Sequence, residues 1–270
     1  ASGCPVLIQF TPVARAYMQP TFLRAFIQAA EAQYPDVDFA VHLDHGTYEH
    51  CLAAILEGSY NSVMIDASHF DFEENVRQTR EVVLRAHDAG ISVEAELGVL
   101  SGVEDHLDID DRLARYTSPD QALEFVQRTG CDSLAVAVGT SHGAYKFSGS
   151  QGLQLDILAQ IQQRLPGLPL VLHGASAVPI EEVERINLAG GHLKSDAQGI
   201  DADQLLEAIA LGVCKVNIAT DMRLIWTRVH REFFRDQCEK FDMVVPGAVY
   251  MEELEHFVAQ KCLFLKNSHV

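Results

Sequence analysis

The stretch DFAVHLDH, residues 38–45, decides the fold class. It begins as an almost unbroken apolar run and ends in two side chains that carry chemistry, Asp44 and His45. Runs of this kind indicate strands that are buried on both faces, as in a parallel sheet. Six more such runs lie at residues 5–10, 62–65, 91–95, 133–138, 168–172 and 214–218.

Amphipathic segments separate these runs. In residues 20–33, Phe22, Leu23, Phe26 and Ile27 recur at helical spacing, and similar patterns cover residues 72–89, 119–128, 153–164 and 201–211. The alternation predicts an α/β fold, specifically a (β/α)8 TIM barrel. Because such a barrel has eight strands and the sequence supplies seven, we expect its first strand–helix unit, roughly 30 residues, to be missing from this sequence.

Composition bounds the remaining possibilities. No linker divides the chain, so we expect one domain over residues 1–270, with a C-terminal helical extension over about 225–270. The net charge of −18 argues against nucleic acid as a partner. The chain has no apolar run of membrane-spanning length, so no membrane association is expected. Six cysteines without a CxxC pair predict reduced thiols and a cytoplasmic location.

Polar side chains follow six successive predicted strands. In a parallel barrel the active site lies at the C-terminal ends of the strands, so these residues are expected to meet on one rim. They are Asp44 and His45; Asp66 and Ser68; Glu94 and Glu96; Ser141, His142 and Gly143; His173, Gly174 and Ser176; and Asn217, Thr220 and Asp221.

Three of these strand ends carry a histidine: His45, His142 and His173. Three imidazoles with an open fourth position form a common catalytic zinc site, although any one of them alone would more often be a hydrogen-bonded barrel histidine. Asp44 is either a general acid and base or a carboxylate that orients a metal ligand, and the residues alone leave both readings open. Asp66 and Glu96 are further candidates for either metal ligation or ligand support.

Small residues at the last three strand ends suggest a phosphate site. Gly143, Gly174, Ser176, Asn217 and Thr220 allow the backbone to approach an anion closely, at the place where barrels often bind phosphate. Lys146 adds a positive charge nearby in the sequence. Ordinary glycine turns are the simpler explanation of any one of these positions.

Five motifs resemble the class II fructose-bisphosphate and tagatose-bisphosphate aldolases. They lie in the family's order and spacing, and the resemblance covers roughly residues 5 to 245. The motifs are HLDHG at 42–46, SVMIDASH at 62–69, VEAELG at 93–98, GTSHGAYK at 139–146 and LVLHGAS at 170–176.

The resemblance implies a role for each candidate residue. His45, His142 and His173 match the zinc ligands, and Asp66 and Glu96 match positions that bind the metal in an alternate place. Asp44 matches the aspartate that transfers a proton, and Glu104 matches a glutamate on a mobile loop over the site. Residues matching the dihydroxyacetone-phosphate site are Gly143, Gly174, Ser176, Asn217 and Thr220.

The resemblance also implies the reaction and its requirements. Zinc acts as a Lewis acid in the reversible cleavage of a ketose 1,6-bisphosphate to dihydroxyacetone phosphate and glyceraldehyde 3-phosphate. The family uses a monovalent cation, Na⁺ or K⁺, and forms homodimers or homotetramers. No Schiff-base lysine is required, and Lys215 is expected to lie away from the catalytic rim.

Two positions depart from the family pattern. Ala219 stands where fructose-type members usually have Asp, and Val244 stands where an Arg contacts the distal phosphate of a neighbouring subunit's substrate. They favour weak discrimination between fructose and tagatose bisphosphates, unless Arg228 or Arg231 reaches the site. An aldolase of another phosphorylated ketose and a catalytically silent barrel that serves as a binding protein are the alternatives.

Overall fold

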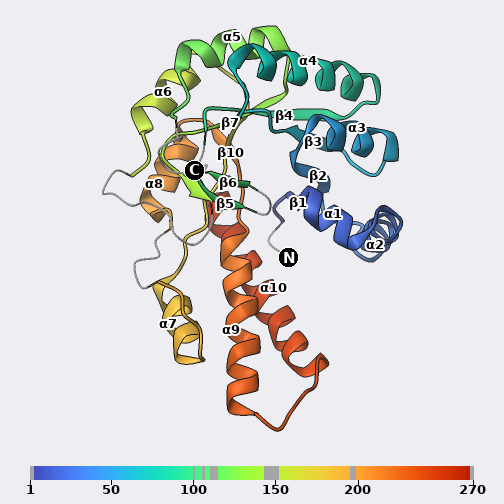
Figure 1. Cartoon of the computed structure of the whole chain (residues 1–270), viewed down its shortest axis with the longest axis vertical. Coiled ribbons are helices and arrows are strands. Elements are labelled where there is room, and N and C mark those ends of the chain that lie inside the picture. The colour runs from blue at the N-terminus through green and yellow to red at the C-terminus, as the bar shows by residue number, and fades with distance from the viewer. Residues whose placement is uncertain are drawn as a thin grey trace.

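Seven strands form one parallel sheet that curls into part of a barrel (Figure 1). This computed structural model describes residues 3–99, 101–104, 107–109, 115–142, 152–194 and 199–267, without the side chains of 101–104, 107–109, 141, 142 and 267. The strands, in sheet order, are β1 (Val6–Phe10), β2 (Phe39–Gly46), β3 (Ser62–Ile65), β4 (Ser92–Leu97), β7 (Ser133–Val136), β9 (Leu170–Leu172) and β10 (Val213–Val216). All seven predicted strands are confirmed.

Several helices cover one face of this sheet (Figure 1). Five match predicted segments: α2 (Pro20–Gln33), α4 (Phe72–Asp88), α5 (Pro119–Thr129), α6 (Leu155–Arg164) and α8 (Ala202–Ala210). Three helices were not predicted, α1 (Pro12–Met18), α3 (Tyr48–Glu57) and α7 (Ile180–Leu188). Helix α3 had a readable signal, since Thr47 caps its first turn in a capping box with His50 and Gly58 ends it in a left-handed conformation.

Both faces of the sheet are buried along β2, β3, β4, β7 and β9, as the apolar runs predicted, whereas Leu7 and Ile8 leave β1 partly exposed. Leu23, Phe125, Leu158 and Leu205 belong to the large cluster between sheet and helices. A separate small cluster, formed by Met64, Ala135 and Val171, comes from β3, β7 and β9. No helix in the described part of the chain is long and apolar enough to cross a membrane. All six cysteines fall within the described ranges, and none forms a disulfide.

A second, small sheet was not predicted. Strands β5 (Ser101–Glu104), β6 (Leu107–Ile109) and β8 (Ser141–His142) form it, in the order β6-β5-β8. Because β5 follows β4 and β8 comes after β7, this sheet belongs to the C-terminal ends of two neighbouring barrel strands. Its strands are too short for periodicity to reveal them.

The last two helices form an arm that extends away from the sheet (Figure 1). Helix α9 (Thr220–Asp236) packs on α7 and on α10 (Val244–Asn267). Arg228 is buried and pairs with Glu182, Glu232 and Glu253, which ties the three helices together.

Polar side chains occupy the interior between β2, β3, β4 and β10. The Nζ of Lys215 lies 2.8 Å from Glu94 Oε2 and 3.4 Å from His42 Nε2. An ammonium group only donates, so His42 Nε2 accepts and His42 Nδ1–H donates to Ser62 Oγ, 2.9 Å away. Lys215 therefore lies in the barrel interior, outside the lining of the rim pocket, but only one side chain from the strand-end residue His173, which Glu94 also contacts.

The buried His42 predicts a specific loss of stability in acid. Burial, together with the charge of Lys215, lowers the pKa of His42 to about 4, whereas the unfolded value is 6.5. Between these values the unfolded chain binds more protons, so stability falls as pH falls. From pH 7 to pH 5 we expect His42 to account for about 2 kcal/mol of lost unfolding free energy.

Denaturant titrations of the chelator-treated protein at both pH values would measure this loss. We expect His42→Gln to lose about 2 kcal/mol less than the wild type over that interval. His256→Gln, which alters an exposed histidine on α10, is the matched control and should behave as wild type. Equal pH dependence in wild type and His42→Gln would contradict the neutral, buried state of His42.

Candidate functional site

The strand ends bring most of the predicted residues to one rim, and those that line it are buried. Exposed fractions range from 1% for His173 to 9% for Asn217. The group comes from β2, β4 and the turns after β3, β9 and β10: Asp44, His45, Asp66, Glu94, Glu96, His173 and Asn217. Placing so many ionisable groups out of water is costly unless they are paired, so their mutual contacts decide what the site can do.

The backbone at His45 is unusual. His45 has a φ of +47°, a conformation that is uncommon outside glycine, and the pairing of β2 with β3 shifts register between Leu43 and Gly46. Gly46 has no room for a side chain, since a Cβ there would lie 2.7 Å from Leu43 Cδ2. This bulge turns the His45 side chain toward the rim.

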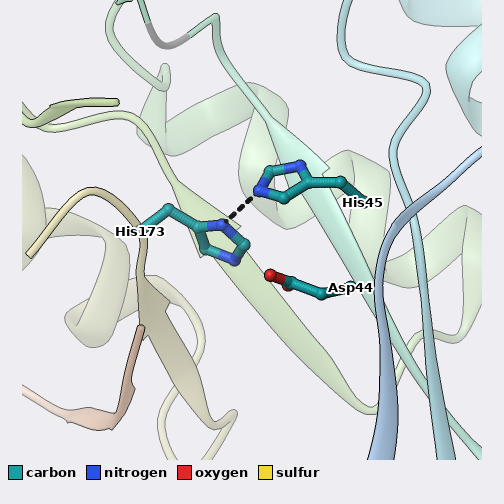
Figure 2. Close-up of side chains that lie close together, drawn as sticks. All are labelled: Asp44, His45 and His173. Atoms are coloured by element: carbon teal, nitrogen blue, oxygen red, sulfur yellow. Dashed lines mark hydrogen bonds between the residues drawn. The ribbon is translucent and has the colours of Figure 1, made fainter. Parts of the chain in front are cut away.

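Two imidazoles face each other across the rim (Figure 2). His45 Nε2 and His173 Nδ1 are 2.8 Å apart, and the rings meet nearly edge to face at 83°. One ligand atom from each of Asp44, His45 and His173 lies within 4.8 Å of the others. Two imidazole nitrogens at this separation suit zinc, and the Asp44 carboxylate lies close enough to act on a group bound beside them.

A buried carboxylate holds the other nitrogen of each ring. His45 Nδ1 lies 2.8 Å from Asp66 Oδ2, and His173 Nε2 lies 2.8 Å from Glu94 Oε1. Because a carboxylate accepts, both of these nitrogens carry protons, which leaves His45 Nε2 and His173 Nδ1 for a shared partner. Carboxylate–histidine pairs of this kind are the usual support of metal-binding histidines.

The electrostatics of the metal-free site agree with this assignment. Burial lowers the pKa of His45, but the carboxylates of Asp44 and Asp66 outweigh it and raise that pKa well above its usual value. Burial lowers the pKa of His173. Burial raises the pKa of Glu94, but Lys215 and His173 outweigh it, so the net shift is downward. In the metal-free site His45 Nε2–H therefore donates to His173 Nδ1. A metal ion bound to both nitrogens would take the place of that proton.

His45, Asp66 and Glu96 form a second group of three candidate ligands. His45 Nδ1 lies 3.9 Å from Glu96 Oε2, on the side of the ring opposite His173. The sequence analysis proposed Asp66 and Glu96 for an alternate metal position, and the structure brings both to the same histidine. Ser68 donates to Asp66 from its hydroxyl and its backbone N–H.

Asn217 connects the histidine pair to Asp44. Its Nδ2 donates to Asp44 Oδ1 at 3.1 Å and lies 3.3 Å from His173 Nε2. Its Oδ1 is buried and accepts no hydrogen bond from the described residues. This unpaired acceptor beside Asp44 can accept a hydrogen bond from a hydroxyl group of a ligand.

A pocket of about 460 Å³ opens beside Asp44 and His173. Gly174, Ser176, Asn217 and Thr220, four residues of the predicted phosphate site, line it together with Ala219. Its far wall contains Arg223, Trp226 and Tyr250 from the arm. Trp226 and Tyr250 had no role in the sequence analysis because their positions reach this wall only through the packing of α9 and α10.

Other predicted residues lie wholly or partly outside the described part of the chain. The backbones of Glu104 and His142 are described in the neighbouring strands β5 and β8, without their side chains. Gly143 and Lys146 lie outside the described residues.

The alternative cations for the distal phosphate do not line this pocket. Arg228 is bound to three glutamates, and Arg231 donates to the Gly190 carbonyl at 2.9 Å. Val244 begins α10 and is 76% exposed. Arg223 is the cation that the sequence analysis missed, four residues after Ala219 in the first turn of α9.

Comparison with known proteins places this geometry in a family. The family model described as fructose-bisphosphate aldolase class-II matches residues 1–269. A fructose-bisphosphate aldolase of Thermus caldophilus is 48% identical over 239 residues, which cover 88% of this chain and 77% of that protein. A fructose-bisphosphate aldolase of Giardia intestinalis is 43% identical over 239 residues, covering 88% and 73%.

Solved structures agree with the sequence relatives. The crystal structure of the YdjI aldolase from Escherichia coli K12 superposes with a TM-score of 0.68 at 32% identity, covering 97% of this chain and 80% of that one. A candidate fructose-1,6-bisphosphate aldolase from Coccidioides immitis has a TM-score of 0.77 at 28% identity, covering 99% and 84%. The resemblance in the five motifs is thereby confirmed, and the chain belongs to the class II fructose-bisphosphate aldolase family.

Proposed function

We propose that this protein catalyses the reversible, zinc-dependent aldol cleavage of a ketose 1,6-bisphosphate, fructose or tagatose 1,6-bisphosphate, to dihydroxyacetone phosphate and glyceraldehyde 3-phosphate. The observation that carries the proposal is the convergence of Asp44, His45 and His173 at the mouth of a pocket lined by Ser176 and Thr220. The names of the relatives, fructose-bisphosphate aldolase, support the same reaction.

His45 Nε2 and His173 Nδ1 are the two nitrogens suited to zinc, and His142 is the proposed third ligand. When bound, zinc supplies a Lewis acid for the ketone oxygen of the substrate. Asp66 and Glu96 would serve an alternate metal position beside His45. A monovalent cation, Na⁺ or K⁺, is part of the proposal on the family resemblance alone.

Asp44 is the proposed general base and acid. In cleavage its carboxylate takes the proton of the C4 hydroxyl, and in condensation it returns that proton. Asn217 holds Asp44 by one hydrogen bond and presents its own Oδ1 to a substrate hydroxyl. Glu104 is the proposed proton donor and acceptor at the carbon left after cleavage.

The phosphate of the dihydroxyacetone half would bind along Gly174, Ser176, Asn217 and Thr220, at the start of α9. The positive end of the helix dipole favours an anion there. Gly143 and Lys146 extend this proposed site from the third strand end.

The other end of the substrate would lie toward the arm. Arg223 supplies a cation on that wall, whereas Ala219 offers no group to read a sugar hydroxyl. This pairing favours a bisphosphate substrate with weak discrimination between the fructose and tagatose isomers. Another phosphorylated ketose is the second candidate. The Ala219 side chain makes no hydrogen bond to a sugar hydroxyl, so this position would not select one ketose over another.

A cleavage assay with both bisphosphates tests this proposal. We expect turnover of fructose and tagatose 1,6-bisphosphates, its loss after chelator treatment, and its recovery on adding zinc. Asp44→Ala should retain zinc but lose at least about 10²-fold in kcat, the usual scale for a general acid–base residue. Asp36→Ala, an exposed aspartate ahead of β2, is the control.

Zinc binding without turnover of either substrate would favour a silent barrel that serves as a binding protein. Near-normal turnover by Asp44→Ala would reduce Asp44 to a residue that orients its neighbours. A several-hundred-fold preference for one isomer would mean that other residues read the sugar.

Self-association is the proposed role of the arm. Apolar side chains at its far end are largely exposed, with Phe241 at 92%, Met243 at 85% and Val244 at 76%. A projecting apolar surface of this kind is best covered by a second copy of the chain in a symmetric dimer or tetramer.

Light scattering coupled to size-exclusion chromatography would test this role. The wild type should have at least twice the mass of one chain, and the Met243→Lys/Val244→Lys variant should shift toward the monomer. Leu56→Lys replaces an equally exposed residue on α3 and serves as the control. A monomeric wild type would rule out the assembly.

A further inference from the structure

The loops after β9 and β10 hold each other by four reciprocal hydrogen bonds. Ser176 Oγ accepts the backbone N–H groups of Ala219, at 3.3 Å, and Thr220, at 3.1 Å. In return the carboxylate of Asp221 accepts the backbone N–H groups of Ala177, at 2.9 Å, and Val178, at 2.8 Å. Asp221 and Ser176 are 1% and 2% exposed, so water does not compete for these bonds.

Val178 is strained where Asp221 holds it. Its φ is +48°, a left-handed conformation that is an outlier for a β-branched residue. Such a conformation costs energy and persists only where the surroundings fix it, which is most often at a functional site. The Val178 side chain is buried against Val183, Ile186 and Leu224, so packing and the carboxylate together hold it.

The opposite side of the loop is also fixed. Ile200 N–H donates to the Ser176 carbonyl at 3.0 Å. A Cβ at Gly199 would lie 2.2 Å from that carbonyl oxygen, so only glycine allows this approach. Residues 176–178 are therefore held from two sides, in one conformation.

This arrangement directs the hydroxyl proton of Ser176. A hydroxyl oxygen has two lone pairs, and the two N–H groups of α9 occupy both. The O–H is then left to donate elsewhere, and Ser176 lines the pocket beside Asp44. Asp221 is not among the residues that line this pocket, and its negative charge would repel an anion placed in contact with it.

We propose that Asp221 is a positioning residue for phosphate: it holds the strained loop so that Ser176 donates to the phosphate monoester of the substrate. The inference rests on the proposed function, which assigns that phosphate to Ser176 and Thr220. Helix α9 receives no side-chain cap from its own N-cap residue, Ala219, and Ser176 of the neighbouring loop caps it instead. The two loops therefore form one binding element.

Asp221→Asn tests this role in the zinc-loaded protein. The amide has nearly the same shape but can accept only one of the two N–H groups and opposes a donor to the other. We expect the Kd for dihydroxyacetone phosphate and the KM for the bisphosphate to rise roughly 10-fold or more, the scale of losing a charge-assisted hydrogen bond. The change in kcat should be much smaller, and zinc affinity should not change.

Val178→Gly tests whether Asp221 acts by holding the strained backbone. Glycine adopts the left-handed conformation without strain, so the loop no longer needs the carboxylate to hold it there. The Asp221→Asn/Val178→Gly variant should bind dihydroxyacetone phosphate more tightly than Asp221→Asn alone. Asp71→Asn removes a carboxylate that accepts a backbone N–H at the start of α4, and as the control it should leave Kd and KM unchanged.

Two results would overturn the inference: an unchanged Kd for dihydroxyacetone phosphate in Asp221→Asn, or equal losses in kcat and zinc affinity that glycine at position 178 does not relieve. If Asp221→Asn does not fold, Asp221→Glu gives the same test, because its extra methylene displaces the oxygens and keeps the charge. A wild type that neither cleaves the bisphosphates nor binds dihydroxyacetone phosphate would instead refute the proposed function.

Discussion

The site depends on two hydrogen bonds, each from the ring of a buried histidine to a buried carboxylate. Asp66 holds His45 Nδ1 and Glu94 holds His173 Nε2, so the two remaining nitrogens face each other. Neither carboxylate would stay charged out of water by itself. Ser68 stabilises Asp66, and Lys215 stabilises Glu94 from the barrel interior.

These contacts link the barrel interior to the chemistry at its rim. Lys215 of β10 contacts His42 of β2 and pairs with Glu94 of β4, the carboxylate that sets the orientation of His173 after β9. The bulge at His45 and the hydrogen-bonded loops at Ser176 and Asp221 hold the backbone on either side of this group of residues. Rigid support of this kind fixes the geometry before substrate arrives, which is the usual way a site preorganises its charges.

The elements that could be predicted from the sequence are those with a plain pattern of apolar residues or a polar residue at a strand end. Seven strands followed from near-continuous apolar runs, and Asp44, His45, His173, Ser176 and Asn217 followed from their positions at strand ends. The helices α1, α3 and α7 were missed, although the capping residues of α3 could have revealed it. The roles of Glu94, Lys215 and Asp221 depend on which partner lies opposite in space, and chain spacing does not encode that. The structure brings the five strand-end residues together, but their catalytic, metal-binding and phosphate-binding roles stay predictions, as do those of His142, Glu104, Gly143 and Lys146.

The affinity for zinc of a Glu94→Gln variant tests this account most directly. Glutamine keeps the shape of the side chain but removes the charge that fixes the His173 tautomer. Competition with a chelator, on protein shown by circular dichroism to be folded, should give zinc binding about 10- to 100-fold weaker than wild type. Glu81→Gln, an exposed partner of Arg77 on α4, should bind zinc as the wild type does. Equal zinc affinity in Glu94→Gln and the wild type would contradict the claim that the buried carboxylates build the metal site.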